Sequence, residues 1–269
     1  MTATPFGILT PKRILLVGDL HANLAAGRAV VEHAYAVGAN LIVQVGDFGF
    51  FPYDLRCRAY LAGMDRRLAE LGQQLLFVDG NHDDHDALAG LPRDDDGLGV
   101  ASSRIRHLPR GHRWNWDGTT WLALGGAPSV DKQWRTIGID WWPREDVTYR
   151  QASEAVEAGP ADVVVAHDSP WIDFGDLYRA YRQHIPAPER TGTGWPTEAL
   201  VRADSHQKLM REVADGVAAK VWVNGHHHVR FTGQAGECRV ESLGMDAQPL
   251  DHLCLLVDPA GNPIRRAAA

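Results

Sequence analysis

The chain has 269 residues and a formal net charge of −7, from 34 acidic and 27 basic residues. Its hydrophobic content of 45% and charged content of 23% are ordinary for a globular protein, and its length suits one large α/β domain. The acidic excess argues against a broad basic surface for nucleic acid. No stretch approaches the roughly 18 apolar residues of a membrane-spanning helix. We therefore expect neither nucleic acid nor membrane as a partner.

Cysteine usage and the first residues indicate the compartment. The three cysteines, Cys57, Cys238 and Cys254, are far apart, odd in number and without a Cys-x-x-Cys pattern. A disulfide framework is therefore not expected, and a reducing cytoplasm fits this usage. Residues 1–12 have no long apolar run after a basic start, so we also expect no signal peptide.

The first third of the chain repeats the order strand, polar loop, helix. Residues 13–17 and 41–45 are apolar runs that lead into Gly-Asp, and residues 74–78 lead into Asp-Gly-Asn-His-Asp. Helices are predicted at 23–38 and 57–71, each stopped by a glycine. This alternation is typical of a parallel α/β sheet. Ligands of such sheets bind outside the carboxyl ends of the strands.

The pattern changes from residue 104 onward. Short candidate strands occupy 105–108, 112–116 and 119–124, and Pro-Arg-Gly and Asp-Gly separate them. Short strands joined by such turn sequences indicate antiparallel hairpins. Further strands are predicted at 163–166, 221–223, 239–243 and 252–257, and a helix at 198–217. Residues 170–198 are rich in Trp, Pro and Gly and fit no element. We interpret them as a cap over the site, or a partner surface, within a single domain spanning residues 1–269.

Side chains that can bind metal follow five of the predicted strands. They are Asp19 with His21, Asp47, Asn81 with His82, His167, and His226 with His228. Carboxylate oxygen, amide oxygen and neutral imidazole suit divalent manganese, iron and zinc. Each motif alone is weak, because a Gly-Asp or a histidine after a strand usually has only a structural role. Together, at successive strand ends, they predict a metal site at one edge of the sheet.

Other residues near these motifs are more ambiguous. Asp168 either supports His167 or is an ordinary loop acid. His227 lies between two candidate ligands and is expected to point away from the metals. His85 and Asp86 are interpreted as the first residues of a helix. The glycines that precede the candidate ligands are expected to permit close backbone approach; they are Gly18, Gly46, Gly80 and Gly225.

The motifs occur in the order Asp-x-His, Gly-Asp, Gly-Asn-His-Asp, a lone His, and Gly-His-x-His. This order, which spans residues 17–228, resembles that of the calcineurin-like metallophosphoesterases. The resemblance implies an α/β fold in which two mixed β-sheets are flanked by helices, a four-layer αββα sandwich. It also implies a metal-dependent hydrolase that acts on a small phosphate ester.

The resemblance implies a role for each motif residue. The metal ligands would be Asp19, His21 and His228 at the first metal, Asn81, His167 and His226 at the second, and Asp47 at both. His82 would lie near the leaving group without binding metal. The implied cofactors are two divalent ions, Mn²⁺ foremost, with Fe, Zn or Ni as alternatives. Such a pair, about 3.5–4 Å apart, lowers the pKa of a bridging water, whose hydroxide then attacks phosphorus.

One position departs from the family pattern. Many members carry an aspartate where this chain has Phe50, and that aspartate supports the histidine that corresponds to His82. Phe50 cannot accept a hydrogen bond, so the partner of His82 is open: Asp83, Asp54 or another group. The arginine of protein-phosphatase members is also missing, and the third motif ends in Asp83 rather than Glu. Both differences argue against a protein phosphatase.

The segment from Gly125 to Asp131, followed by Arg135 and Trp141-Trp142-Pro143, resembles small bacterial and phage members of the family. Trp134 and Arg135 are candidate substrate contacts, because they could stack on a base and hold a phosphate. Alternatively, these aromatic residues pack the underside of the sandwich.

The leading interpretation is a phosphodiesterase acting on a small nucleotide-like ester, including cyclic nucleotides. The alternatives are a phosphomonoesterase or protein phosphatase, a nuclease, and a non-catalytic scaffold on the same fold. The scaffold is disfavoured, because such relatives usually lack ligands and here every position is filled. The sequence leaves homo-oligomerisation open.

Overall fold

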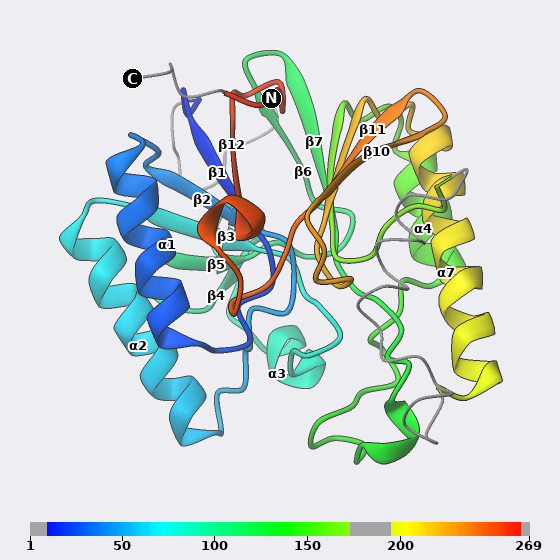
Figure 1. Ribbon diagram of the computed structural model, residues 1–269, viewed down its shortest axis with the longest axis horizontal. Helices are drawn as coiled ribbons and strands as arrows, with labels where there is room; N and C mark the ends of the chain where they lie inside the picture. The colour runs from blue at the N-terminus through cyan, green and yellow to red at the C-terminus, as the bar shows by residue number, and fades with distance from the viewer. Residues whose placement is uncertain (1–9, 173–194, 265–269) are drawn as a thin grey trace.

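A computed structural model describes residues 10–172 and 195–264 of the chain. Two six-stranded sheets pack face to face, and helices cover the outer face of each sheet (Figure 1). This is the four-layer αββα sandwich expected from the sequence motifs.

The elements of the first half of the sandwich are β1 (Ile14–Val17), α1 (Leu24–Ala36), β2 (Leu41–Gln44), α2 (Leu55–Glu70), β3 (Gln74–Phe77), α3 (His85–Ala89), β4 (Gly99–Val100), β5 (Ile105–His107), α8 (Leu250–Leu253) and β12 (Cys254–Val257). Those of the second half are β6 (Arg113–Trp116), β7 (Thr119–Leu124), α4 (Tyr149–Glu157), β8 (Val163–Ala166), α7 (Thr197–Gly216), β9 (Val221–Asn224), β10 (Phe231–Ala235) and β11 (Cys238–Ser242). A short 3₁₀ helix spans Lys132–Trp134. The strand orders are β12-β1-β2-β3-β5-β4 and β10-β11-β9-β8-β7-β6.

Three layers of buried side chains hold the sandwich together. The layer between the sheets contains Trp114, Trp116 and Trp121, which are fully buried and pack ring against ring. Helices α1 and α2 cover the first sheet, and α4 and α7 cover the second. The central strands are therefore buried on both faces, which explains their continuous apolar runs.

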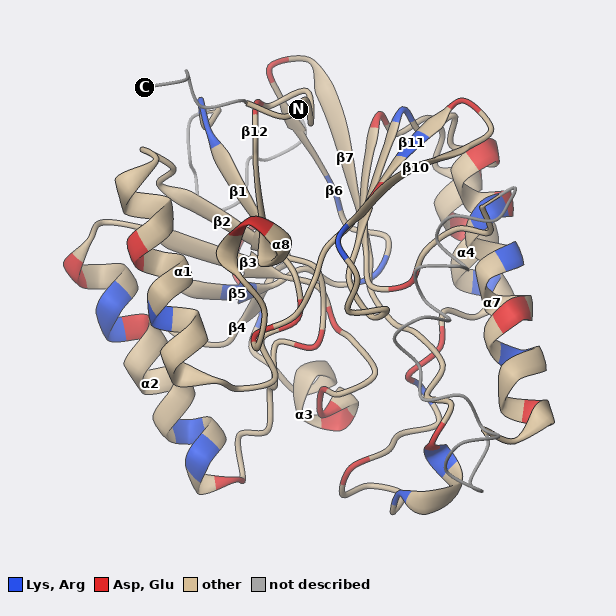
Figure 2. Ribbon diagram, in the orientation of Figure 1, with Lys and Arg blue, Asp and Glu red and all other residues tan. Residues whose placement is uncertain are grey.

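The strand directions place the polar motifs together. Strands β1, β2 and β3 are parallel, as are β7, β8 and β9 in the other sheet. Their carboxyl ends therefore open toward the same central region (Figure 1). Acidic segments lie in the loops of this region, whereas acidic and basic residues are interspersed along the outer helices (Figure 2).

Most predicted elements are confirmed, with small shifts at their ends. The prediction that 105–108 forms a hairpin with the next run is wrong: β5 is parallel to β3 and antiparallel to β4 in the first sheet. Strands β4 and β10 and helices α4 and α8 were not predicted from the sequence. A signal for α4 was present, because Thr148 and Gln151 form a reciprocal capping box at its start.

Part of the predicted cap, residues 173–194, lies outside the described residues, and α7 follows it at Thr197. Within residues 10–172 and 195–264, no helix is long and apolar enough to cross a bilayer.

Candidate metal centre

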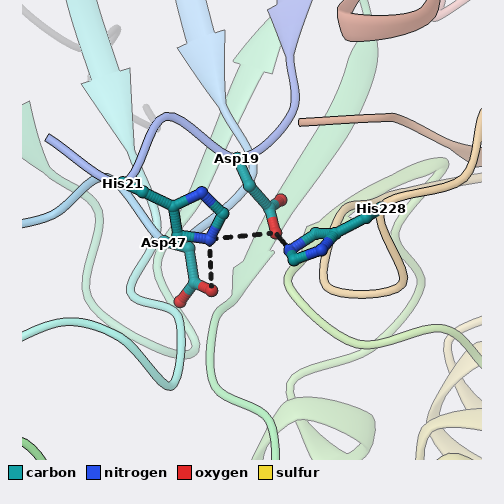
Figure 3. Close-up of side chains that lie close together, drawn as sticks. All are labelled: Asp19, His21, Asp47 and His228. Atoms are coloured by element: carbon teal, nitrogen blue, oxygen red, sulfur yellow. Dashed lines mark ion pairs between the residues drawn. The ribbon is translucent and has the colours of Figure 1, made fainter. Parts of the chain in front are cut away.

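Four predicted ligands from three strand ends lie together. The metal-binding atoms of Asp19, His21, Asp47 and His228 are all within 4.8 Å of one another. Their side chains converge on one point in Figure 3. Nε2 of His21 lies 3.4 Å from Oδ2 of Asp47, and Nε2 of His228 lies 3.0 Å from Oδ2 of Asp19. The parallel strands therefore assemble the set that the sequence places at their ends.

A second cluster lies beside the first and meets it at Asp47. Nε2 of His167 lies 3.1 Å from Oδ1 of Asn81 and 3.3 Å from Oδ1 of Asp47. The rings of His167 and His226 have their centroids 5.0 Å apart. We call Asp19, His21 and His228 the outer group, and Asn81, His167 and His226 the inner group. Asp47 contacts both through different oxygens.

The backbone of these loops is unusual. His21, Asp47, His226 and His228 all have positive φ angles, between 44° and 64°. This left-handed conformation disfavours residues with a Cβ and typically costs about 1–3 kcal/mol at each position. Four of the predicted ligands thus share a strained geometry that the surrounding structure must impose. Such strain is characteristic of functional sites.

Two motif glycines allow the candidate ligands to approach the neighbouring loop. A Cβ placed on Gly225 would lie 2.0 Å from Oδ1 of Asp19, and one on Gly80 would lie 2.1 Å from Oδ1 of Asp47. Real Cβ atoms are not found at such distances. Any side chain at either position would therefore displace a carboxylate of the centre.

The donor set fits divalent cations. Oδ2 of Asp47 is buried and has no hydrogen-bond partner. A buried carboxylate oxygen without a donor is unfavourable. A cation between the outer group and Asp47 would satisfy this oxygen, and the oxygen and imidazole donors suit such an ion.

The electrostatics of the centre also favour cations. Burial lowers the pKa of His21, but the carboxylates of Asp47 and Asp19 outweigh it and raise the pKa to about 10. His167 shows the same balance and also reaches a pKa of about 10. In the absence of a cation, the carboxylates therefore hold protons on both imidazoles. A metal must replace these protons, because only the neutral ring is a ligand.

Asp246 orients the outer group and was not singled out from the sequence. Its Oδ1 accepts a hydrogen bond from Nδ1 of His21 at 3.1 Å, and its Oδ2 accepts one from Nδ2 of Asn23 at 2.7 Å. The first bond leaves Nε2 of His21 directed at Asp47. The only sequence signal was an aspartate shortly after a strand, which is also common in turns.

Ser129 and Glu145 orient the inner group. Nδ2 of Asn81 donates to Oγ of Ser129 at 3.1 Å, and this hydroxyl donates to Oε2 of Glu145 at 2.5 Å. Glu145 is fully buried and also pairs with Arg202 of α7 at 2.9 Å. Because Nδ2 of Asn81 is occupied, its Oδ1 faces His167. Ser129 belongs to the segment from Gly125 to Asp131, for which the sequence predicted no role.

Asp168 supports the loops that carry the inner group. Its Oδ2 contacts Nδ1 of His206 at 2.6 Å, and its Oδ1 contacts Nε2 of His227 at 3.1 Å. Asp168 also accepts a hydrogen bond from the backbone of Ser169. Asp168, His226 and His227 come close enough to form a separate cation site. The Asp168 carboxylate is already committed to these donors, however, so we interpret it as a support for its neighbour His167.

The partner of His82 is Arg135. Nη2 of Arg135 lies 2.8 Å from Nε2 of His82 and also donates to Oδ2 of Asp131 at 2.8 Å. A guanidinium can only donate, so Nε2 of His82 is the acceptor and the ring is neutral. Burial lowers the pKa of His82 and Arg135 lowers it further, against the opposing effect of Asp47. The positive charge at this position therefore resides on Arg135.

The two acids considered as partners of His82 have other roles. Asp83 is fully buried and accepts hydrogen bonds from the backbones of Gly49, Phe50 and Gly80. Asp54 caps the start of α2.

The predicted aromatic contacts differ in exposure. Trp142 is almost fully buried and packs against Phe51. Trp134 is 56% exposed, with its ring 5.7 Å from that of Trp195. Trp142 therefore packs against the loop that precedes α2 rather than on the underside of the sandwich, whereas Trp134 presents its ring to solvent. His85 begins α3, as expected from the sequence.

Comparison with known families gives one extended match. The sequence profile of the calcineurin-like phosphoesterases matches residues 12–230. The chain belongs to the calcineurin-like phosphoesterase family. The family typically binds two divalent metals, and the chain is accordingly a metal-dependent phosphoric ester hydrolase. A comparison with curated protein sequences gives no significant match.

Solved structures share the fold at low sequence identity. The chain is similar to TT1561 of Thermus thermophilus, with 12% identity and a TM-score of 0.53 over 93% of this chain and 100% of that one. It is also similar to a dimetal phosphatase from Danio rerio, with 12% identity and a TM-score of 0.50 over 92% and 93% of the two chains. At this identity the likeness establishes the fold alone.

Proposed function

We propose that the protein is a two-metal phosphodiesterase that hydrolyses a small nucleotide-like ester, cyclic nucleotides included. The position of Asp47 is the observation that carries this proposal. Its Oδ2 lies 3.4 Å from His21 of the outer group, and its Oδ1 lies 3.3 Å from His167 of the inner group. One carboxylate thus joins two sets of ligands, as a binuclear centre requires.

Each group would hold one divalent ion, and Asp47 would bind both. When bound, the two ions supply Lewis acidity and an activated water for attack on phosphorus. The mixture of carboxylate, amide and imidazole donors is compatible with Mn²⁺, the ion we propose, and also with Fe, Zn or Ni. His82 donates its backbone N–H to Oδ1 of Asp47 at 2.7 Å and thereby fixes this shared ligand.

Arg135 would supply the fixed positive charge of the chain itself. Its guanidinium is held between His82 and Asp131, and its side chain is only 10% exposed. A cation held in this way stabilises negative charge that develops on a phosphoryl or leaving-group oxygen. His82 would act mainly by keeping Arg135 in place. Trp134, on the same segment, is the second proposed substrate contact.

The preference for a diester rests on two features. The protein-phosphatase arginine is missing, and the third motif ends in Asp83 rather than Glu. In addition, a cavity of about 600 Å³ borders the ligand His21. A cavity of this size leaves room for a second substituent on the phosphate.

The test is hydrolysis of bis(p-nitrophenyl) phosphate and of p-nitrophenyl phosphate by metal-stripped protein to which Mn²⁺ is returned. We expect cleavage that depends on the metal and favours the diester. Preference for the monoester would change the proposal to a phosphomonoesterase. Failure to cleave either ester with both metals bound would contradict hydrolysis of simple esters and restore the scaffold alternative.

A further inference from the structure

The cavity beside the metal centre is lined by segments that are distant in sequence. They are His21 with Ala22, residues between 51 and 57, Asp84, and Gly138 with Ile139. The segments 51–57 and 138–139 lie beyond the carboxyl ends of the strands, in the lower part of Figure 1. The cavity therefore begins at a candidate metal ligand and extends between two loops.

Large apolar side chains at the mouth of this cavity are exposed. Tyr53 is 86% exposed and Ile139 is 69% exposed. Exposed apolar surface beside a catalytic centre is characteristic of a ligand site. A planar group bound between these side chains would remove apolar surface from water on both of its faces.

The polar residues of the cavity offer few free groups. The carboxylates of Asp54 and Asp84 already accept backbone hydrogen bonds at the starts of α2 and α3. Burial and Asp54 raise the pKa of the Cys57 thiol to about 11, so this thiol is neutral. The side chain of Arg56 is 95% exposed. Arg56 lines the same cavity, with its Nε 4.0 Å from Oδ1 of Asp54, and offsets one of the two carboxylates, so no strong charge of the lining selects a charged occupant.

We propose that this cavity binds the substituent that stays on the phosphate during hydrolysis, and that this substituent is an uncharged planar group such as a nucleobase or an aryl ring. The proposal rests on the proposed phosphodiesterase activity. The leaving group is assigned elsewhere because it needs the positive charge of Arg135. Among the described residues, neither Arg135 nor His82 lines the cavity, whereas His21 does.

The experiment measures the manganese-dependent cleavage of three phosphodiesters. They share the leaving group p-nitrophenolate and differ in the retained group, which is methyl, phenyl or thymidine 5′. We expect the wild-type kcat/KM to be about tenfold higher for the phenyl and thymidine esters than for the methyl ester, the usual scale for one stacked ring. Tyr53→Ala and Ile139→Ala should each reduce this preference severalfold, because they should lower kcat/KM for the phenyl and thymidine esters more than for the methyl ester.

Tyr149→Ala is the matched control, because Tyr149 is 73% exposed on α4, away from the cavity. Equal loss for all three esters in Tyr53→Ala and Ile139→Ala would place the leaving group in the cavity and overturn the proposal. An unchanged preference in both variants would also overturn it, while the phosphodiesterase would stand.

Absence of manganese-dependent cleavage would instead contradict the phosphodiesterase. In that case, the binding of thymidine 5′-monophosphate to the manganese-loaded protein, measured by calorimetry, tests whether the cavity binds a planar group. Weaker binding in Tyr53→Ala than in Tyr149→Ala would support it, and equal binding would refute it.

Discussion

The two halves of the candidate centre differ in their exposure to solvent. In the outer group, the side chains of His21 and His228 are 26% and 37% exposed. In the inner group, His167 is fully buried and Asn81 is 3% exposed, whereas His226 is partly exposed. A metal in the outer group can therefore exchange with solvent more readily than one in the inner group.

The residues that orient the two groups differ in solvent exposure in the same way as the groups themselves. Asp246, which orients His21, is itself 15% exposed and comes from the loop after β11. The inner group is held by Ser129 and the fully buried Glu145, which connects it to α7 through Arg202. We infer that the inner group binds its metal first and more tightly, whereas the outer group sets the apparent metal requirement for activity.

The largest effect is expected for the residue that the two groups share. Asp47→Asn removes a negative charge that contacts both groups, so we expect neither metal to be retained and nearly all activity to be lost. Metal content after dialysis and the rate of diester cleavage test this prediction. Asp65→Asn is the control, because Asp65 also accepts several hydrogen bonds but lies away from the centre. Retention of one metal in Asp47→Asn would show that Asp47 belongs to a single group.

A second prediction separates the chemistry from metal binding. Arg135→Ala should lower kcat about 100- to 1000-fold, the usual scale for losing one group that stabilises developing charge, with metal content unchanged. His82→Ala should keep both metals and reduce kcat less, since the guanidinium remains. Arg144→Ala, which removes an exposed arginine paired with Asp86, is the control. A larger loss in His82→Ala than in Arg135→Ala would return the main role to the histidine.

The pH dependence of metal binding offers a third test. The pKa values of His21 and His167 are both raised to about 10, so each ring carries a proton at neutral pH in the metal-free protein. Each metal therefore displaces one proton, and its affinity should rise about tenfold per pH unit from pH 7 toward 10. Calorimetry in buffers of different ionisation enthalpy measures the released protons. Proton release at only one step would show that the two groups are not electrostatically equivalent.

The parallel strands and the candidate ligands were predictable because they depend on short, regular signals, whereas the two-sheet sandwich was implied by the resemblance of the motif order to the family. Buried parallel strands give continuous apolar runs, and each polar motif directly follows one of them. The capping side chains Asn23 and Asp54 likewise stand immediately before the helices that they start. These relations involve neighbours in sequence, so the chain itself displays them.

The supporting residues could not be predicted, because their roles depend on partners far along the chain. Asp246 lies 225 residues from His21, and Arg135 lies 53 residues from His82. Phe50 showed that His82 needed a different partner, but nothing local indicated an arginine. The edge hairpin formed by β10 was missed because Gly233 and alternating polar residues interrupt its apolar pattern.

The smallest expected effect concerns the residues that orient each group. Asp246→Ala should weaken the more weakly bound metal about 10- to 100-fold, the usual range for removing such a support, and leave the tighter one unchanged. Ser129→Ala should do the opposite, because Asn81 is then free to rotate its amide. Two-step calorimetric titration with Mn²⁺ resolves the two affinities, and thermal unfolding checks that both variants fold.

Ser102→Ala is the control for the serine variant, because the hydroxyl of Ser102 also binds a carboxylate, that of Asp65, but lies away from the centre. If Ser129→Ala instead weakened the looser metal, the assignment of the tighter site to the buried group would be wrong. Equal weakening of both metals by each variant would mean that Asp47 transmits the disturbance between the groups. In that case the difference in burial would not give the two metals separate affinities, and the centre would load as one cooperative unit.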